Sequence, residues 1–325
     1  MKAIVCEAPG GPEVLTIGDV PDPVPGPGEV LVEVRATALN RADLLQRRGL
    51  YPPPPGASEI LGLECSGVVA ALGAGAARFS TGARVMALLP GGGYAERVAV
   101  HEEVLLPIPE RLSFEEAAAV PEAFLTASEV LLVEAELDRW QTLLVTAAAS
   151  GVGSAAMQIG KLRGAFVIGS ASAGKLAAVK ELGADLALDR ERSDYVEAVR
   201  AATRDRGVDV LIDFIGASAL QRHQACLATR GRLVLVGLLG GATAQLDLGQ
   251  LLRKRQRLCG LVMRSRSLAE KVEVVRRFQR ELWSALDSGT LSPRLDQIFP
   301  FADVAAAHGR MERNLNTGKI VLRLG

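Results

Sequence analysis

A repeat of apolar run, glycine-containing turn and helical stretch begins near Phe124 and restricts the possible fold more than any other feature. Its clearest unit has an apolar run at 143–147, a loop of small residues at 148–153, and apolar residues at helical spacing within 154–162. Another apolar run follows at 166–170. Strands that alternate with helices form a parallel sheet covered on both faces. The middle of the chain therefore predicts an α/β domain with a doubly wound sheet.

The two ends of the chain share a different pattern. Short apolar runs in the first 120 residues alternate with turn signals, and residues 30–38 have the period of two that is typical of a half-buried strand. Residues 316–324 end in a similar alternation. We therefore expect one β-rich domain from residues 1–123 and 288–325. An α/β domain of residues 124–287 would be inserted between its two parts.

Composition excludes several classes of protein. Of the 325 residues, 49% are hydrophobic, which excludes disorder as the dominant state. Lys plus Arg and Asp plus Glu both number 37, so no overall charge favours nucleic acid or an anionic membrane. The four cysteines have neither zinc-finger nor disulfide-scaffold spacing. No apolar run reaches the roughly 20 residues of a membrane span, and Glu7 comes too early for a secretory signal, so we expect a cytoplasmic protein.

The loop AAASGVGS lies where a dinucleotide-binding loop is expected, after a strand and before a helix. Gly153 fits the glycine pattern, with Gly151 beside it, whereas Ala148 and Ser150 replace its first two glycines. Small residues let the backbone approach a diphosphate, and a helix N-terminus offers unpaired N–H groups to it. A tight turn between strand and helix is the alternative interpretation.

Six segments of the chain together resemble one known family. They are NRADLLQRRGLY (40–51), PPPPGASEILGLECSGVV (52–69), ALLPGGGYAERV (87–98), PEAFLTA (121–127), AAASGVGSAA (147–156) and NTGKIVL (316–322). In this order they resemble the zinc-independent quinone oxidoreductases of the medium-chain dehydrogenase/reductase superfamily, from end to end. The resemblance implies a GroES-like β-rich catalytic domain, an inserted Rossmann domain, a cleft between them that holds NADPH, and a homodimer.

The resemblance also implies that no metal is bound. Zinc-dependent relatives have Cys and His at two ligand positions that carry Asn40 and Leu63 here. Zinc needs about three ligands of nitrogen, sulfur or carboxylate type, and a leucine donates none. We therefore expect no metal ligand in this chain.

The second strand of the α/β repeat indicates NADPH rather than NADH. Domains that prefer NAD carry an acid near its end for the ribose 2′-hydroxyl, but no acid follows here until Glu181. Lys175 matches a family lysine at the 2′-phosphate, and Arg190 stands where the family often has a tyrosine. Both cations are surface charges in the alternative interpretation.

The resemblance assigns the remaining cofactor contacts. They are Asn40, Thr126, Ser150, Gly151, Val152, Gly153, Ser172, Leu238, Arg264 and Asn316, besides Lys175 and Arg190. Each polar contact has a structural alternative. The hydroxyls of Ser150 and Thr126 can satisfy local backbone groups, Asn316 can be a turn residue, and Arg264 can be a surface charge.

Tyr51 is the candidate for the acceptor site, because the matching family tyrosine contributes to quinone binding. Its phenol can donate a hydrogen bond to a quinone oxygen, although it can also simply cover the proline-rich loop. We place Ser150, Asn40 and Asp43 with it as catalytic candidates. Asp43 is equally suited to act as a structural hydrogen-bond acceptor.

These observations predict an NADPH-dependent quinone reductase. One rival is a reductase of activated alkenes, such as 2-enals or enoyl thioesters, and another is an NADPH-binding structural or RNA-binding protein. The basic run RKRQR at 253–257 is a local exception to the neutral composition, but it is more typical of a solvated face. The apolar runs at 232–237 and 258–263 predict a sheet edge for homodimer formation.

Overall fold

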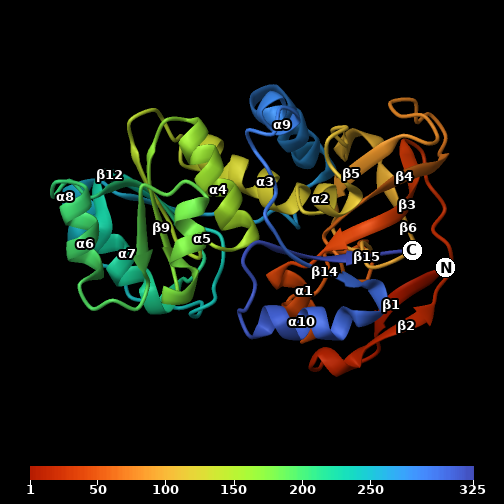
Figure 1. Cartoon of the computed structure of the whole chain (residues 1–325), viewed down its shortest axis with the longest axis horizontal. Helices are drawn as coiled ribbons and strands as arrows, with labels where there is room; N and C mark the ends of the chain where they lie inside the picture. The colour runs from red at the N-terminus through yellow and green to blue at the C-terminus, as the bar shows by residue number, and fades with distance from the viewer. The chain divides into compact units, whose positions relative to one another are not determined.

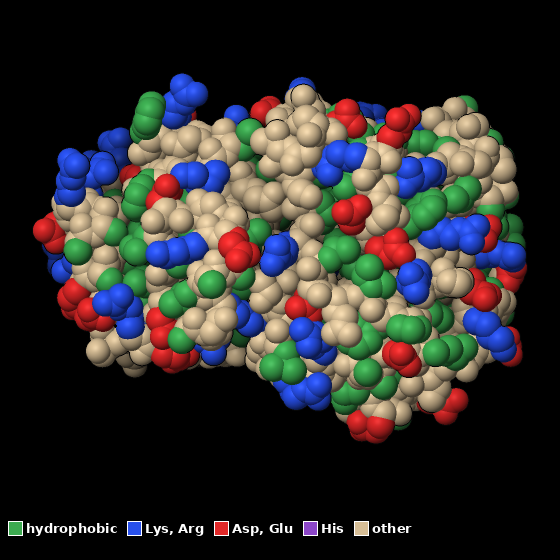
Figure 2. All heavy atoms as spheres, in the orientation of Figure 1, with side chains coloured by type: hydrophobic (Ala, Val, Ile, Leu, Met, Phe, Trp, Pro, Cys, Tyr) green, Lys and Arg blue, Asp and Glu red, His purple; other side chains and the backbone are tan.

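The computed structural model describes residues 1–325 and divides into two compact units. The end unit comprises Met1–Leu125 and Met263–Gly325, and the inserted unit comprises Thr126–Val262. Residues 263–287, which we expected in the inserted domain, group with the chain ends. On the face shown in Figure 2, Lys and Arg side chains are interspersed with Asp and Glu. No helix has both the length and the apolar character needed to cross a membrane.

The inserted unit contains the doubly wound parallel sheet expected from the sequence (Figure 1). Its six strands lie in the order β10-β9-β8-β11-β12-β13, and every neighbouring pair is parallel. The strands are β8 Thr142–Val145, β9 Phe166–Ala171, β10 Leu186–Asp189, β11 Val208–Asp213, β12 Leu227–Leu235 and β13 Arg257–Gly260. This order reverses direction at β8, as in Rossmann domains, where ligands bind outside the carboxyl ends of the strands.

Five α-helices of the inserted unit connect or flank these strands. They are α4 Gly151–Leu162, α5 Leu176–Glu181, α6 Tyr195–Ala202, α7 Leu220–Cys226 and α8 Leu248–Lys254. A π-helix at Glu129–Glu134 and 3-10 turns at Ala173–Lys175 and Ala217–Ala219 complete the unit. Its core places Leu144, Ile168 and Leu211 of three adjacent strands against the buried Tyr195 and Val199 of α6.

The end unit is built on a larger, mainly antiparallel sheet. Its path is β14-β15-β3-β4-β5-β7, with β6 also paired to β3, and β1 and β2 form a separate ribbon. The strands are β1 Lys2–Cys6, β2 Leu15–Asp19, β3 Glu29–Ala38, β4 Glu64–Leu72, β5 Arg84–Leu88, β6 Arg97–His101, β7 Leu105–Pro107, β14 Leu295–Pro300 and β15 Lys319–Arg323. Because β15 pairs with β3 at Val321 and Ala38, the two chain ends share one sheet, as the alternation of both predicts (Figure 1).

The helices of the end unit are short apart from α9. They are α1 Arg41–Arg47, α2 Phe114–Ala118, α9 Leu268–Asp287 and α10 Val304–Glu312, with 3-10 turns at Pro12–Val14, Glu102–Val104 and Phe301–Asp303. Helix α3, Pro121–Ser128, runs across the boundary of the two units.

Helix α9 explains why residues 263–287 lie in the end unit. A capping box starts it, in which Ser267 and Glu270 bond each other's backbone N–H groups. The helix buries Phe278, Leu282 and Leu286 at intervals of four residues. At its end, the Arg111 guanidinium of the end unit donates to the carbonyl oxygens of residues 286, 287 and 291. The hydrophobic stripe alone could not reveal this partner.

Candidate functional site

The loop between β8 and α4 has the geometry of a diphosphate cradle. Ser150 caps α4, because its Oγ accepts a hydrogen bond from the Gly153 amide at 3.1 Å. A Cβ atom at Gly153 would lie 2.4 Å from the Ala147 carbonyl oxygen, so only glycine fits there without a shift. The amides of Gly151 and Val152 open the helix and have no intrahelical acceptor. These backbone groups suit an anion.

Three predicted cofactor residues lie at the same carboxyl edge of the sheet as this loop. The Ala148 amide donates to the backbone carbonyl oxygen of Ser170, near the end of β9. Ser172 and Lys175 follow that strand directly. The Arg190 amide, which follows β10, donates to Ala171 at 2.9 Å. The structure therefore brings Ser172, Lys175 and Arg190 together beside the loop. The Arg190 side chain also pairs with the exposed Glu191 at 2.8 Å.

The other two candidates of the inserted unit have contrasting environments. Leu238 is 50% exposed and follows the carboxyl end of β12. Thr126 is buried, and its Oγ1 has no hydrogen-bond partner in the chain. A buried hydroxyl without a partner is costly unless something else satisfies it. The structural alternative for Thr126, local satisfaction of the backbone, is therefore not what the geometry shows.

In the end unit, Asn40 belongs to a buried charged cluster that the sequence analysis did not identify. Its Nδ2 donates to Glu64 Oε1 at 2.9 Å, and its Oδ1 accepts from the Lys319 ammonium at 2.7 Å. Lys319 and Glu64 also form a direct ion pair at 2.5 Å, with both side chains almost fully buried. The second Glu64 oxygen accepts from the Glu122 amide at 2.8 Å. Both ends of the Asn40 amide are therefore fixed by protein groups.

This donor set does not suit a zinc ion. The Asn40 oxygen already accepts from a cation, and the neighbouring Leu63 is a buried hydrocarbon. No group of three or more His, Cys, Asp or Glu side chains in the chain is arranged to hold a metal. Because zinc requires about three such ligands, the residues present do not fit it.

Asp43 fixes the backbone next to the buried charged cluster by accepting hydrogen bonds. Its carboxylate accepts from the amides of Asn40 at 2.7 Å and Gly62 at 3.0 Å, and from the Tyr94 hydroxyl at 3.4 Å. Burial raises the pKa of Asp43 to about 6, and those two amides oppose the rise. This geometry favours the structural alternative for Asp43, because its oxygens already have protein donors.

A series of hydrogen bonds between buried side chains links Asp43 through Tyr94 to His308 and Arg47. The Arg47 guanidinium donates to His308 Nδ1 at 3.1 Å, so the proton of a neutral imidazole lies on Nε2. His308 Nε2 is 3.2 Å from the Tyr94 oxygen, which in turn donates to Asp43. Burial lowers the pKa of His308 to about 3, and so the imidazole is neutral near pH 7. Each of these four side chains therefore has a hydrogen-bond partner within the series.

Tyr51 is held by Arg264, whose guanidinium carbon lies 5.2 Å from the centroid of the tyrosine ring. Arg264 is buried. Its guanidinium donates to the backbone carbonyl oxygens of Tyr51 at 3.3 Å and Pro90 at 2.8 Å, and to the side-chain Oε1 of Gln46 at 2.6 Å. These bonds show that Arg264 is not a solvated surface charge. Burial raises the pKa of Tyr51, so its phenol is a neutral donor at pH 7.

Glu122 is a further carboxyl of this region that the sequence analysis did not single out. Burial, with the Glu64 charge as the next contribution, raises the pKa of Glu122 to about 8. When Glu122 is ionised, its negative charge also raises the pKa of Tyr51. Glu64, Glu122 and Lys319 all lie inside the motifs GLE, PEAF and NTGK, which was the available signal. Asn316 of the last motif is buried, and its Nδ2 donates to the Gly318 carbonyl oxygen at 2.9 Å, as a turn residue would.

Two family models match the chain. The one described as alcohol dehydrogenase GroES-like domain matches residues 26–110, and the one described as zinc-binding dehydrogenase matches residues 151–280. The chain is 35% identical to a quinone oxidoreductase of Pseudomonas aeruginosa over 99% of both sequences. It is 34% identical to the synaptic vesicle membrane protein VAT-1 homolog of Rattus norvegicus, over 99% of the chain and 84% of the relative.

Solved structures agree with these relatives along the whole chain. A mycobacterial protein complexed with NADPH has a TM-score of 0.90 at 30% identity, with 100% of both chains covered. The CurK enoyl reductase has a TM-score of 0.88 at 26% identity, with 100% of this chain and 99% of that chain covered. The fold, the full-length relatives and the unsuitable zinc positions lead to one conclusion: the chain belongs to the zinc-independent quinone oxidoreductase branch of the medium-chain dehydrogenase/reductase superfamily.

Proposed function

We propose that this oxidoreductase uses NADPH to reduce quinones without a metal. The observation that carries the proposal is the carboxyl edge of the inserted sheet, where a diphosphate cradle lies beside Lys175 and Arg190 and no acid follows β9 directly. The full-length similarity to a quinone oxidoreductase supports the choice of acceptor. The relative solved with NADPH supports the choice of cofactor.

Each unit, taken by itself, carries proposed cofactor contacts. The amides of Gly151 and Val152 face the diphosphate, while Gly153, whose amide donates to Ser150 Oγ, lets the backbone come close to it. Ser172, Lys175 and Arg190 surround the 2′-phosphate. Ser150, the unpartnered Thr126 hydroxyl and Leu238 contact it from the inserted unit. Asn40, Arg264 and Asn316 are its proposed contacts in the end unit. When bound, NADPH supplies the hydride.

The protein's part in the reaction is to orient the acceptor and to meet the charge that grows on its oxygen. Tyr51 is suited to this, because its neutral phenol donates a hydrogen bond and Arg264 fixes its ring. Glu122 is mostly protonated at pH 7 with a pKa of about 8, so it holds a proton near the same tyrosine. We assign Tyr51 as donor and Glu122 as a proton reservoir.

A panel of acceptors tests the proposal. Purified protein is supplied with NADPH or NADH and with a benzoquinone, a naphthoquinone, a 2-enal and an enoyl thioester. We expect the highest kcat/KM with NADPH and a quinone. A 2-enal or enoyl thioester reduced with a higher kcat/KM than every quinone would instead establish the second candidate, an alkene reductase. The similarity to the CurK enoyl reductase favours that candidate.

A further inference from the structure

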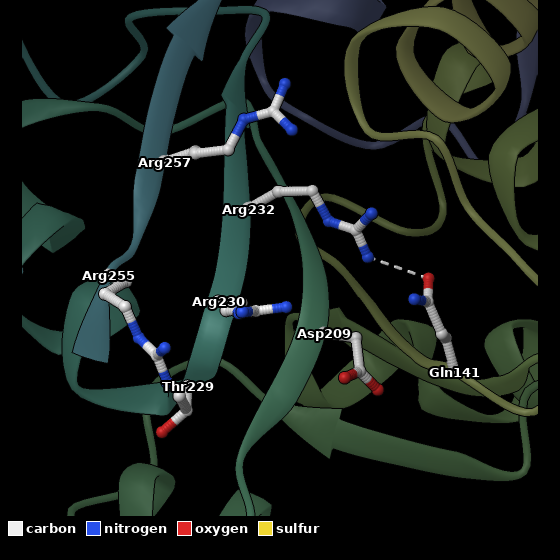
Figure 3. A pocket seen from close by; sticks show the side chains of 7 residues that line it. All are labelled: Gln141, Asp209, Thr229, Arg230, Arg232, Arg255 and Arg257. Atoms are coloured by element: carbon white, nitrogen blue, oxygen red, sulfur yellow. Dashed lines mark hydrogen bonds between the residues drawn. The ribbon is translucent and has the colours of Figure 1, made fainter.

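A hollow of about 520 Å³, lined by the side chains drawn in Figure 3, lies in the inserted unit. Four arginines line it together with Gln141, Asp209 and Thr229, and these are Arg230, Arg232, Arg255 and Arg257. Gln141 precedes β8, Asp209 is the second residue of β11, and Arg257 is the first residue of β13. The hollow is therefore at the amino edge of the parallel sheet, whereas the cofactor loop follows the carboxyl end of β8. We call it the arginine pocket.

The strand register places two arginines of the pocket side by side. Arg232 of β12 is the direct partner of Arg257 of β13, and so their side chains leave the sheet on the same face. Like charges at directly opposed positions repel each other. Arg257 has only a 3.4 Å contact with the exposed Glu136 to offset this repulsion. An anion between the two guanidinium groups would remove it.

Arg232 has an unused donor at the same place. The residue is only 9% exposed, and its two terminal nitrogens donate to Glu136 O at 3.2 Å and Gln141 Oε1 at 2.8 Å. Its Nε, however, is buried without a partner. Figure 3 shows that Arg230 and Arg232 both extend from β12 toward Asp209 and Gln141. A buried guanidinium N–H without a hydrogen-bond partner lowers the stability of the fold.

The other two arginines have no ion-pair partner. Arg230 and Arg255 are exposed, and both have a left-handed backbone, with φ of 62° and 51°. Asp209 is the one acid that lines the pocket, and its Oδ2 already accepts from the Thr142 amide at 2.8 Å. Positive charge is therefore in clear excess, although the chain as a whole is neutral.

We propose that the arginine pocket binds a small anion that carries phosphate groups. The planar fork of arginine matches phosphate oxygens in pairs, and the volume is within the range of ligand sites. No aromatic or apolar side chain lines the pocket, so nothing there stacks on a nucleobase, and the phosphates themselves are recognised. The inference does not depend on the acceptor, since the pocket and the cofactor loop are at opposite edges of the sheet.

Calorimetric titration of the full chain with tripolyphosphate, in saturating NADPH, tests this site. The test variant is the double substitution Arg230→Ala and Arg255→Ala, which removes two exposed, unpaired charges. The matched control is Arg204→Ala with Arg253→Ala. It removes two exposed arginines of the same unit that do not line the pocket, and Arg204 also has a positive φ. Thermal unfolding verifies that both variants fold.

We expect tripolyphosphate to bind the wild-type protein with NADPH present and to bind more weakly as salt rises. The test variant should bind at least about tenfold more weakly, because two charge-assisted contacts are lost, and the control should bind like wild type. The proposal is wrong if no binding occurs, if both variants lose affinity equally, or if NADPH abolishes binding. An RNA oligonucleotide that binds more tightly than tripolyphosphate through the same arginines would show a nucleic-acid site instead.

Discussion

At the scale of single residues, substitution of Tyr51 can test how the acceptor is activated. The residues at the zinc positions do not fit a metal, so in the proposed reaction the charge on a quinone oxygen must be met by hydrogen-bond donors, for which the neutral Tyr51 phenol is our candidate. Tyr51→Phe should lower kcat/KM for quinones by about tenfold, less than the full loss of a donor in a dry site. Tyr51→Ala should lower it further, because Arg264 loses the ring beneath it. NADPH dissociation constants should stay near wild type, and unchanged quinone rates in both variants would reduce Tyr51 to a packing residue.

Glu122 adds a pH dependence to the same site. Its pKa is raised to about 8, so the carboxyl is protonated at neutral pH and loses its proton as pH rises through about 8. We expect kcat/KM for a quinone to fall as the pH rises through about 8. Glu122→Gln, which cannot ionise, should remove this limb of the pH profile. Glu110→Gln, an exposed control, should keep it. A limb that persists in Glu122→Gln belongs to another group.

The same residue links pH to stability. Because the folded state holds the Glu122 proton more tightly than the unfolded chain does, the free energy of unfolding falls as pH rises from about 4.5 to about 8. Glu122→Gln should lessen this fall.

We expect Lys175 to set the preference between the two nicotinamide cofactors. It follows β9 beside the phosphate loop, where a 2′-phosphate would lie. Loss of one charge-assisted contact costs about 1.5–3 kcal/mol, roughly ten- to a hundredfold in affinity. Lys175→Ala should weaken NADPH binding by this factor and leave NADH nearly unchanged, as measured by fluorescence titration. Lys180→Ala removes an exposed charge from α5 and should change neither. Equal weakening of both cofactors would contradict the assignment.

At the scale of elements, the turn from β8 to α4, which we propose as the diphosphate cradle, is closely packed at Gly153. Gly153→Ala would place a methyl group 2.4 Å from the Ala147 carbonyl oxygen. We expect this overpacking to lower the free energy of unfolding by about 1–3 kcal/mol and to weaken NADPH binding, because the amides of the loop shift. Gly309→Ala in α10 is the control. Its new methyl group would approach only the flexible end of Arg313, so stability should be unchanged or higher. Wild-type NADPH affinity in Gly153→Ala would show that the loop does not need this close packing.

The elements also show what can be read from the sequence. The run at 143–147 predicted β8, but α4 begins at Gly151 rather than at 154, because the Ser150 cap extends the helix over the glycines. Alternation predicted β3 and β15, because a strand with one buried face repeats every two residues. The pattern could not reveal the Lys319–Glu64 pair or the Arg47–His308–Tyr94 chain, since charged residues read as exposed until a tertiary partner is known. The arginine pocket was missed for a related reason, because its residues come from four separate segments.

At the scale of the whole molecule, the open edge of the inserted sheet predicts a homodimer. Strand β13 is the last strand of that sheet, and one of its sides has no neighbour in the chain. Such an edge pairs readily with a second copy of itself. The Leu261 amide donates inward to Leu235, so alternation turns the amides of Leu258 and Gly260 to the open side.

Substitution at this edge gives the test. Light scattering at micromolar concentration should give twice the 34.2 kDa of one chain. Leu258→Pro removes one outward N–H but leaves the inward bonds to β12, so it should yield a folded monomer. Leu258→Ala loses a similar side chain and keeps the N–H, and it should remain more dimeric. A monomeric wild-type protein would refute the proposal, and a dimer that survives Leu258→Pro would place the interface elsewhere.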